Sequence, residues 1–133
     1  MTRAATGFDI HVPFVEHLGL QLLEKRNGTV RMRLQPQPEF ENSWGSMHGG
    51  ALMTLLDVAL ASAARSLDEH CNGALTVEIK VNFVAAAAGT VLAEGRAQRA
   101  GRSLIFSEGE LRSENGTLLA KATGTFKLLY PKD

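Results

Sequence analysis

One acidic side chain stands inside the most apolar stretch of the sequence. Between Gly50 and Ala64, the only polar side chains are those of Thr54, Asp57 and Ser62. A helix that is apolar on nearly every side is usually a buried one, so we expect Asp57 to be buried within it. A buried carboxylate costs free energy unless it is paired or takes part in chemistry. Asp57 is therefore a candidate catalytic group, and a buried structural acceptor is the alternative interpretation.

The elements around this stretch follow from apolar spacing and turn-forming residues. Pro13 suits the first turn of a short helix that Gly19 ends, the pair Asn27-Gly28 predicts a tight hairpin, and the long apolar helix should end near Leu67. Strand-like patterns cover residues 20–24, 29–34, 76–83, 90–99, 103–113 and 117–130. A hairpin, a long helix and a meander of four strands predict one α+β domain over residues 1–133, with the helix against a single antiparallel sheet.

The strand expected after the helix has a strict alternation of side chains. Its dry face would hold Val77, Ile79, Val81 and Phe83, and its wet face would hold Thr76, Glu78, Lys80 and Asn82. A single sheet touches only one side of a helix, whereas this helix is apolar on nearly all sides. We therefore expect a second copy of the chain to cover the rest.

The charge and cysteine content exclude several classes of protein. The formal net charge is zero, which gives no reason to expect a nucleic acid or an anionic membrane as partner. The single cysteine, Cys71, excludes an intrachain disulfide and a CxxC-type zinc site. Residues 1–14 lack the apolar core of a signal peptide, and the long helix is too short for a membrane span. We expect a cytoplasmic protein without a metal or cofactor.

Several motifs together resemble a known family. The loop before the long helix contains Asn42, the helix begins at His48, Gly49 and Gly50, and Asp57 lies within it. The strand TVEIKVNF, the turn AGRS and the strand AKATGTF follow. This series resembles the hotdog-fold acyl-CoA thioesterases, specifically the PaaI-like (phenylacetic acid degradation) branch of the 4-hydroxybenzoyl-CoA thioesterase superfamily. The resemblance extends from about Phe14 to the C-terminus. It implies an antiparallel sheet wrapped around one central helix.

The resemblance also implies roles for individual residues. The backbone N–H of Gly49 would polarise the thioester carbonyl at the helix N-terminus, where unpaired amides favour negative charge. Asp57 would act as general base or nucleophile, His48 would orient the loop, and Asn42 and Thr76 would help place water or substrate oxygen. A bend between loop and helix is the alternative for Gly49, and an Asx turn is an equally good one for Asn42.

The spacing of the two main groups predicts an oligomer. Asp57 follows Gly49 by eight residues, which is about 12 Å along one helix. One carbonyl cannot contact both groups of the same chain, so two subunits must contribute them, as in a two-fold dimer with two equivalent sites. Tetramers are also common in this family, and the dimer and the tetramer both stay open at this point.

A coenzyme A substrate requires local positive charge and an apolar pocket. Arg99, Arg102 and Ser103 at the AGRS turn are the candidates for binding its phosphates, and exposed turn charges are the alternative. Arg65 and Lys80 are weaker candidates. The residues available for an acyl pocket are Phe40, Trp44, Met47, Met53, Phe83 and Val84.

We therefore expect hydrolysis of an aryl-CoA or of a short- or medium-chain acyl-CoA to the free acid and CoA. Two other functions remain open on the same scaffold. One is a non-catalytic acyl-CoA binding module, which should not depend on Asp57. The other is a hotdog acyl-thioester dehydratase or hydratase, because a fold alone does not decide chemistry.

Overall fold

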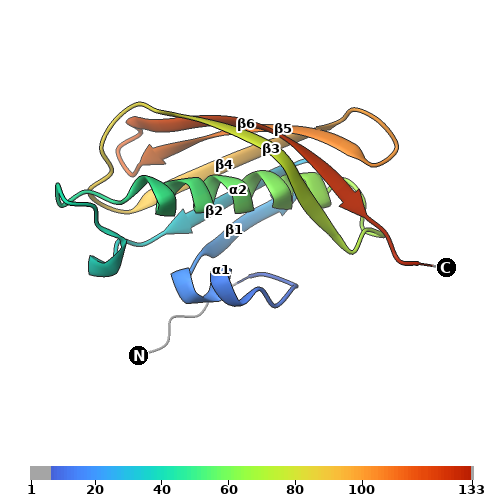
Figure 1. Cartoon of the computed structure of the whole chain (residues 1–133), viewed down its shortest axis with the longest axis horizontal. Coiled ribbons are helices and arrows are strands. Elements are labelled where there is room, and N and C mark those ends of the chain that lie inside the picture. The colour runs from blue at the N-terminus through green and yellow to red at the C-terminus, as the bar shows by residue number, and fades with distance from the viewer. Residues whose placement is uncertain (1–6, 133) are drawn as a thin grey trace.

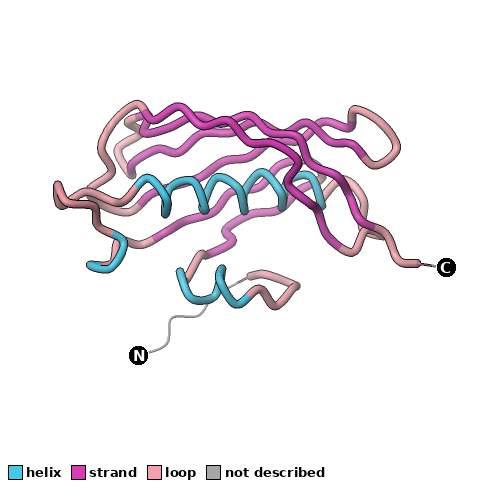
Figure 2. The backbone as a smooth tube through the Cα atoms, viewed as in Figure 1, coloured by secondary structure: helices cyan, strands magenta, loops and turns pink. Residues whose placement is uncertain are grey.

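The computed structural model describes residues 7–132, and an antiparallel sheet wraps around one long helix (Figures 1 and 2). The sheet has six strands in the order β1-β2-β4-β5-β6-β3. The strands are β1 (Gln21–Arg26), β2 (Thr29–Leu34), β3 (Gly73–Phe83), β4 (Val91–Arg99), β5 (Leu104–Ser113) and β6 (Leu118–Leu129). The helices are α1 (Pro13–Leu18), a 3-10 turn η1 (Pro38–Phe40) and α2 (Gly49–Arg65). This is the hotdog arrangement that the resemblance implies.

The C-terminal ends of α1 and α2 can be explained by particular residues. Gly19 adopts a left-handed conformation with φ 72° and ends α1, as expected. Helix α2 ends at Arg65, two residues before the expected position. Its last turn is tied to the β1–β2 hairpin, since the hydroxyl of Ser66 donates to the carbonyl of Ala63 and accepts from the N–H of Gly28.

The expected meander of four strands is wrong at its first connection. Strands β4, β5 and β6 do form neighbouring antiparallel pairs, but β3 pairs with β6 and not with β4. The segment 84–90 is the reason, because it is too long for a tight turn and leaves β3 beside β6, where the N–H groups of Val84 and Ala85 donate to the carbonyl of Leu119. The chain then crosses to β4, which pairs with β2. Strand β3 is consequently an edge of the sheet.

One face of α2 packs closely on the sheet. Gly95 and Gly109 lie beneath it, and a Cβ at Gly95 would come within 2.9 Å of the carbonyl oxygen of Ala59. The buried helix residues are Leu52, Leu55, Leu56, Ala59, Leu60, Ser62, Ala63 and Ala64. The opposite face is open in the single chain, so Asp57 is half-buried and not buried as the apolar pattern suggests. No helix within residues 7–132 is long and apolar enough to cross a membrane.

A bulge in β3 changes which side chains face the helix. The pairing with β6 shifts between Thr76 and Glu78, so Val77 is an extra residue. Thr76 therefore turns toward α2, where its hydroxyl contacts Asp57, and Val77 is 59% exposed. The expected wet position of Thr76 and dry position of Val77 are both wrong for this reason. After the bulge the alternation resumes, and Ile79 packs against the core as expected.

Candidate active site

The N-terminus of α2 leaves one backbone amide open. His48 is the N-cap, and its ring Nδ1 accepts a hydrogen bond of 2.8 Å from the N–H of Gly50. The N–H groups of Ala51 and Leu52 donate to the carbonyl of His48. Within residues 7–132, the N–H of Gly49 has no acceptor. The first turn therefore presents a single unpaired donor, supported by a histidine that holds its neighbour.

The loop before α2 is shaped by Asn42. Its side-chain oxygen accepts from the N–H of Trp44 at 2.8 Å and from the N–H of Ser46 at 3.1 Å, and Gly45 has a φ of 81°. This is the Asx turn considered as the alternative for Asn42. The carboxamide nitrogen is not used in the turn. A role in placing water or substrate stays a prediction.

A hollow of about 410 Å³ lies against the open amide, and we call it the Gly49 hollow. Its lining includes Asn42, Trp44, Met47, Gly49 and Phe83. The ring of Phe83 covers the glycine, since a Cβ on Gly49 would lie 3.4 Å from the ring carbon Cζ. Trp44 is 86% exposed there, whereas Phe40 is buried in the core and does not line the hollow.

A second hollow of about 280 Å³, the Asp57 hollow, contains the carboxylate. The hydroxyl of Thr76 donates to Oδ1 of Asp57 at 2.7 Å. The other oxygen, Oδ2, has no partner within residues 7–132. Asp57 therefore has one oxygen held by a donor and one oxygen free for chemistry.

The two hollows are separate in one chain. Gly49 lines only the first and Asp57 only the second, and about 12 Å of helix lies between the two residues. The structure thus brings Asp57 together with Thr76, and it brings Gly49 together with His48, Asn42 and Phe83. It does not bring these two groups together within a single chain.

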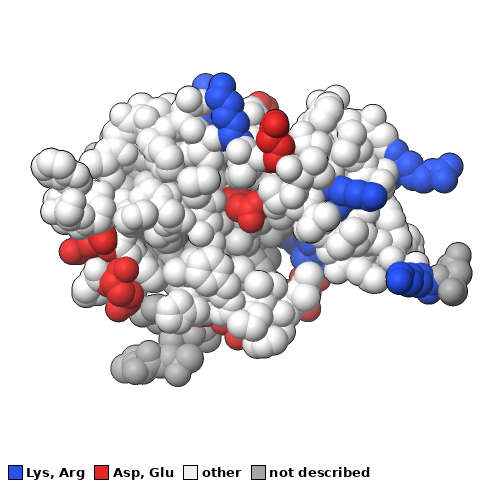
Figure 3. All heavy atoms as spheres, viewed as in Figure 1, with Lys and Arg blue, Asp and Glu red and all other residues white. Residues whose placement is uncertain are grey.

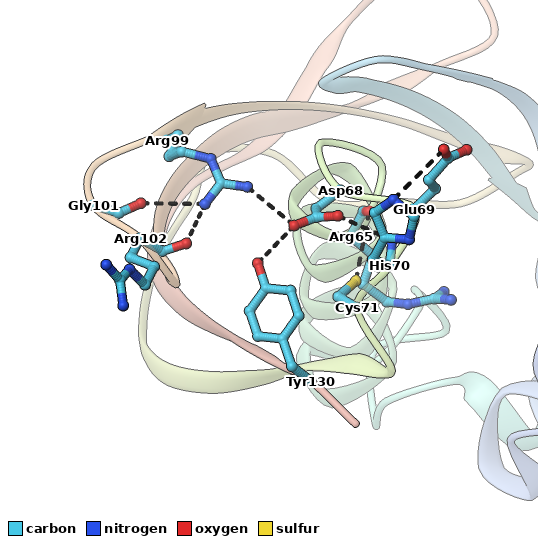
Figure 4. Close-up of polar contacts among 9 residues, drawn as sticks. All are labelled: Arg65, Asp68, Glu69, His70, Cys71, Arg99, Gly101, Arg102 and Tyr130. Carbon is cyan, nitrogen blue, oxygen red and sulfur yellow. Dashed lines mark hydrogen bonds and ion pairs between the residues drawn. The ribbon is translucent and has the colours of Figure 1, made fainter. Parts of the chain in front are cut away.

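The turn between β4 and β5 lies at the other end of α2 (Figure 4). The guanidinium of Arg99 donates to the carbonyls of Gly101 and Arg102, and it pairs with Asp68 at 3.6 Å. Tyr130 donates its hydroxyl proton to the same carboxylate at 2.8 Å. Since α2 has 17 residues, this turn lies about 25 Å along the helix from Gly49 of the same chain.

The charges in this cluster stabilise one another. The backbone N–H of His70 and the hydroxyl of Tyr130 lower the pKa of Asp68, and the hydrogen bond to Asp68 raises the pKa of Tyr130. Arg99 is thus engaged in holding the turn. The guanidinium of Arg102 is exposed, points away from the cluster in Figure 4, and has no acidic partner within residues 7–132. Ser103 accepts at its carbonyl from the N–H of Leu128.

Sequence reasoning did not identify one wall of the Asp57 hollow. That wall is the segment before and within α1, which contributes Phe8, Ile10, Val12 and Val15. The sequence feature that could have predicted this wall is the alternation of Phe8, Ile10 and Val12 with polar residues. Such alternation is typical of an extended segment with one apolar side. Arg65, expected as a weak candidate for binding phosphate, also lines this hollow.

Comparisons with known proteins agree on a family. Residues 45–120 match the model of the thioesterase superfamily. The medium/long-chain acyl-CoA thioesterase YigI of Salmonella typhimurium is 26% identical to this chain, over 90% of this chain and 87% of YigI. A conserved protein of Pseudomonas aeruginosa of known structure is 34% identical, with a TM-score of 0.81 over 90% of this chain and 95% of that chain. The PaaI protein of the Escherichia coli phenylacetic acid degradation operon, 20% identical with a TM-score of 0.77 over 84% of this chain and 80% of PaaI, shares the fold.

Proposed function

Because the chain belongs to the thioesterase superfamily and is a thioester hydrolase, we propose that it hydrolyses acyl-CoA thioesters to a free acid and CoA. The observation that carries this proposal is a pair of complementary groups. One is the open N–H of Gly49 at the start of α2, and the other is the carboxylate of Asp57, held on one oxygen by Thr76. We place the chain in the PaaI-like branch on its His48-Gly49-Gly50 motif and the position of Asp57.

The active form is a homodimer in which each site uses both subunits. Strand β3 is an unpaired edge of the sheet, and its apolar side chains Leu75 and Val77 are 56% and 59% exposed. An unpaired strand edge with exposed apolar side chains can pair with another strand. Two β3 edges joined about a two-fold axis would extend the sheet and lay two α2 helices side by side. Asp57 of one subunit would then face Gly49 of the other.

The surface over this region suits such a contact. The face shown in Figure 3 is largely uncharged over its upper left, with an acidic group near the centre and others at the lower left. Charged residues are depleted at the core of protein interfaces. The helix residue Met53 is 40% exposed on the single chain, and a second subunit would cover it. Two such dimers would form the tetramer that is the other expected state, and light scattering distinguishes the two masses.

In this arrangement the backbone N–H of Gly49 donates to the thioester carbonyl oxygen and stabilises the negative charge that develops there. In a general-base route, Asp57 takes a proton from water while the water oxygen attacks the carbonyl carbon. The tetrahedral intermediate then loses the CoA thiolate, which takes up that proton at sulfur. In a nucleophilic route, a carboxylate oxygen attacks the carbon and displaces the CoA thiolate, which leaves a mixed anhydride. Water then hydrolyses the anhydride to the free acid and protonated Asp57, and that proton passes to the thiolate sulfur. Both routes use the free Oδ2, and neither needs a metal or an organic cofactor.

Other residues would position these groups. Thr76 fixes the carboxylate, and His48 keeps the N–H of Gly50 occupied, so that Gly49 is the donor left for the substrate. Arg102 would bind a CoA phosphate, because its guanidinium is exposed and the fork of an arginine matches phosphate oxygens. Arg99 would hold the turn that presents Arg102, through its hydrogen bonds to the turn carbonyls.

The test is release of free thiol from a panel of aryl-, short-chain and medium-chain acyl-CoAs. Asp57→Asn keeps the shape of the side chain and removes the base, so kcat should fall by about a hundredfold or more. Glu69→Gln is the matched control, because the carboxylate of Glu69 is 90% exposed beyond the end of α2. Size-exclusion chromatography checks that the dimer persists in both variants.

Three results would contradict the proposal. Unchanged turnover in Asp57→Asn would remove Asp57 from the chemistry. Tight binding of acyl-CoA without thiol release from the wild-type protein would favour a binding module instead. Hydration of an enoyl-CoA without hydrolysis would favour the hydratase alternative.

A further inference from the structure

The Asp57 hollow has a wall that the proposed chemistry does not use. The N-terminal segment, residues 8–16, runs along the open face of α2 and includes the first part of α1 (Figure 1). It covers the second half of that face, beyond Asp57. The carboxylate therefore lies at one end of a partly open hollow and not on a flat surface.

The chemistry of the lining changes along this space. Asp57 and Thr76 are the polar groups at the catalytic end. The apolar part of the lining consists of Phe8, Ile10, Val12 and Val15 from the N-terminal segment and Val58 and Ala61 from α2. Glu16, Ser62 and Arg65 also line the hollow, and Arg65 is paired with Asp9. An apolar space that begins at the reacting carbon suits the hydrocarbon part of an acyl group.

The volume limits the size of that group. The hollow holds about 280 Å³. At about 30 Å³ per small group in a liquid, this space accommodates roughly nine non-hydrogen atoms. A medium-chain acyl group or a phenylacyl group has this size, whereas an acetyl group would leave most of the hollow empty and a long-chain acyl group would exceed it.

The N-terminal segment is held in place by contacts at both of its ends. Val15 is buried in the core, and Phe8 packs against the core cluster. Between them, Asp9 pairs with Arg65 of α2 at 3.5 Å. Partial burial raises the pKa of Asp9, but the charges of Lys25 and Arg65 outweigh this and lower it. The wall is thus attached to α2 through a charged contact as well as by apolar packing.

We propose that the acyl group of the substrate lies in the Asp57 hollow and that the N-terminal segment, together with Val58 and Ala61, selects medium-chain or phenylacyl groups by length. This inference rests on the proposed thioesterase function. It assigns the specificity-determining surface to a part of the chain outside the residues of the catalytic motif.

Two substitutions with opposite effects test it. Ala61→Leu extends a larger side chain into the hollow, and Val58→Ala enlarges the hollow. The readout is kcat/KM for butanoyl-, octanoyl-, dodecanoyl- and phenylacetyl-CoA. A change of one methylene in an apolar pocket alters this ratio by roughly tenfold or more. Ala61→Leu should therefore lower kcat/KM for octanoyl- and phenylacetyl-CoA at least tenfold relative to butanoyl-CoA, and Val58→Ala should shift the preference toward dodecanoyl-CoA.

A matched control separates size from general disturbance. Ala88→Leu adds the same side chain at an exposed position that lines neither hollow, and its length profile should equal that of the wild type. Unchanged profiles in both Ala61→Leu and Val58→Ala, with Asp57-dependent hydrolysis intact, would overturn the acyl-site inference alone. Absence of hydrolysis by the wild-type protein on every thioester would overturn the proposed function and this inference together.

Discussion

The hydrogen bond from Thr76 to Asp57 gives the sharpest test of the site. Thr76→Val keeps the β-branched shape that suits a strand and removes only the hydroxyl, which donates to Oδ1 of Asp57 at 2.7 Å. A hydrogen bond to a charged group contributes about 1.5–3 kcal/mol. If the bond positions the carboxylate in the transition state, its loss should lower kcat roughly 10- to 150-fold.

The assay is thiol release at saturating octanoyl-CoA and at saturating phenylacetyl-CoA, with kcat and KM determined separately. We expect the loss in kcat, because Thr76 contacts Asp57, the carboxylate that we propose to be catalytic. Thr123→Val is the control, since Thr123 is an exposed threonine on β6. A Thr76→Val enzyme with kcat within threefold of the wild type would refute the positioning role of the hydroxyl.

Two further predictions concern the helix N-terminus and the pH dependence of stability. Gly49→Ala adds a methyl group 3.4 Å from the Phe83 ring, at the place where we propose that the substrate carbonyl binds. The value of kcat/KM should fall at least tenfold while the melting temperature stays within about 3 °C. An unchanged kcat/KM would contradict the donor role of Gly49. The hydrogen bond from Arg96 lowers the pKa of Glu110 below its ordinary value of 4.5, against the effect of burial. This contribution to stability is complete above about pH 4.5 and is lost as the pH falls through the lower folded-state pKa of Glu110. The wild type should therefore lose more stability on acidification than Glu110→Gln. An equal decrease of melting temperature with pH in the two proteins would refute this.

The helix and strand positions could be predicted from local patterns. Alternation and turn residues such as Gly19 and Gly28 fix where elements begin and end, and the observed strands differ from the expected ones by a few residues at their ends. The order of strands could not be predicted in the same way. Whether segment 84–90 turns back or crosses the sheet depends on contacts with β6, such as the bonds to Leu119, which are distant in sequence.

The candidate site was predictable in its residue types and less so in its contacts. A resemblance of motifs pointed to Gly49, Asp57 and Thr76, but the alternation alone placed Thr76 on the wrong face of β3. Arg99 looked equivalent to Arg102 in the sequence, and only the structure distinguishes the arginine that holds the turn from the one that is exposed. The degree of burial of Asp57 was overestimated, because composition does not show which face of a helix its own sheet covers.

The extra residue in β3 decides whether Thr76 and Phe83, which lie in different hollows, face the same side of the strand. Thr76 and Phe83 are seven positions apart, and in a regular strand an odd separation puts two side chains on opposite faces. Both face α2 here because the bulge at Val77 shifts the phase by one residue. Substitutions at Val77, which is largely exposed, should be tolerated. Deletion of one residue between Glu78 and Asn82, with the bulge kept, would put Thr76 and Phe83 on opposite faces and so separate the Asp57 contact from the cover of Gly49. The site is thus more sensitive to insertions and deletions in this strand than to many changes of residue identity.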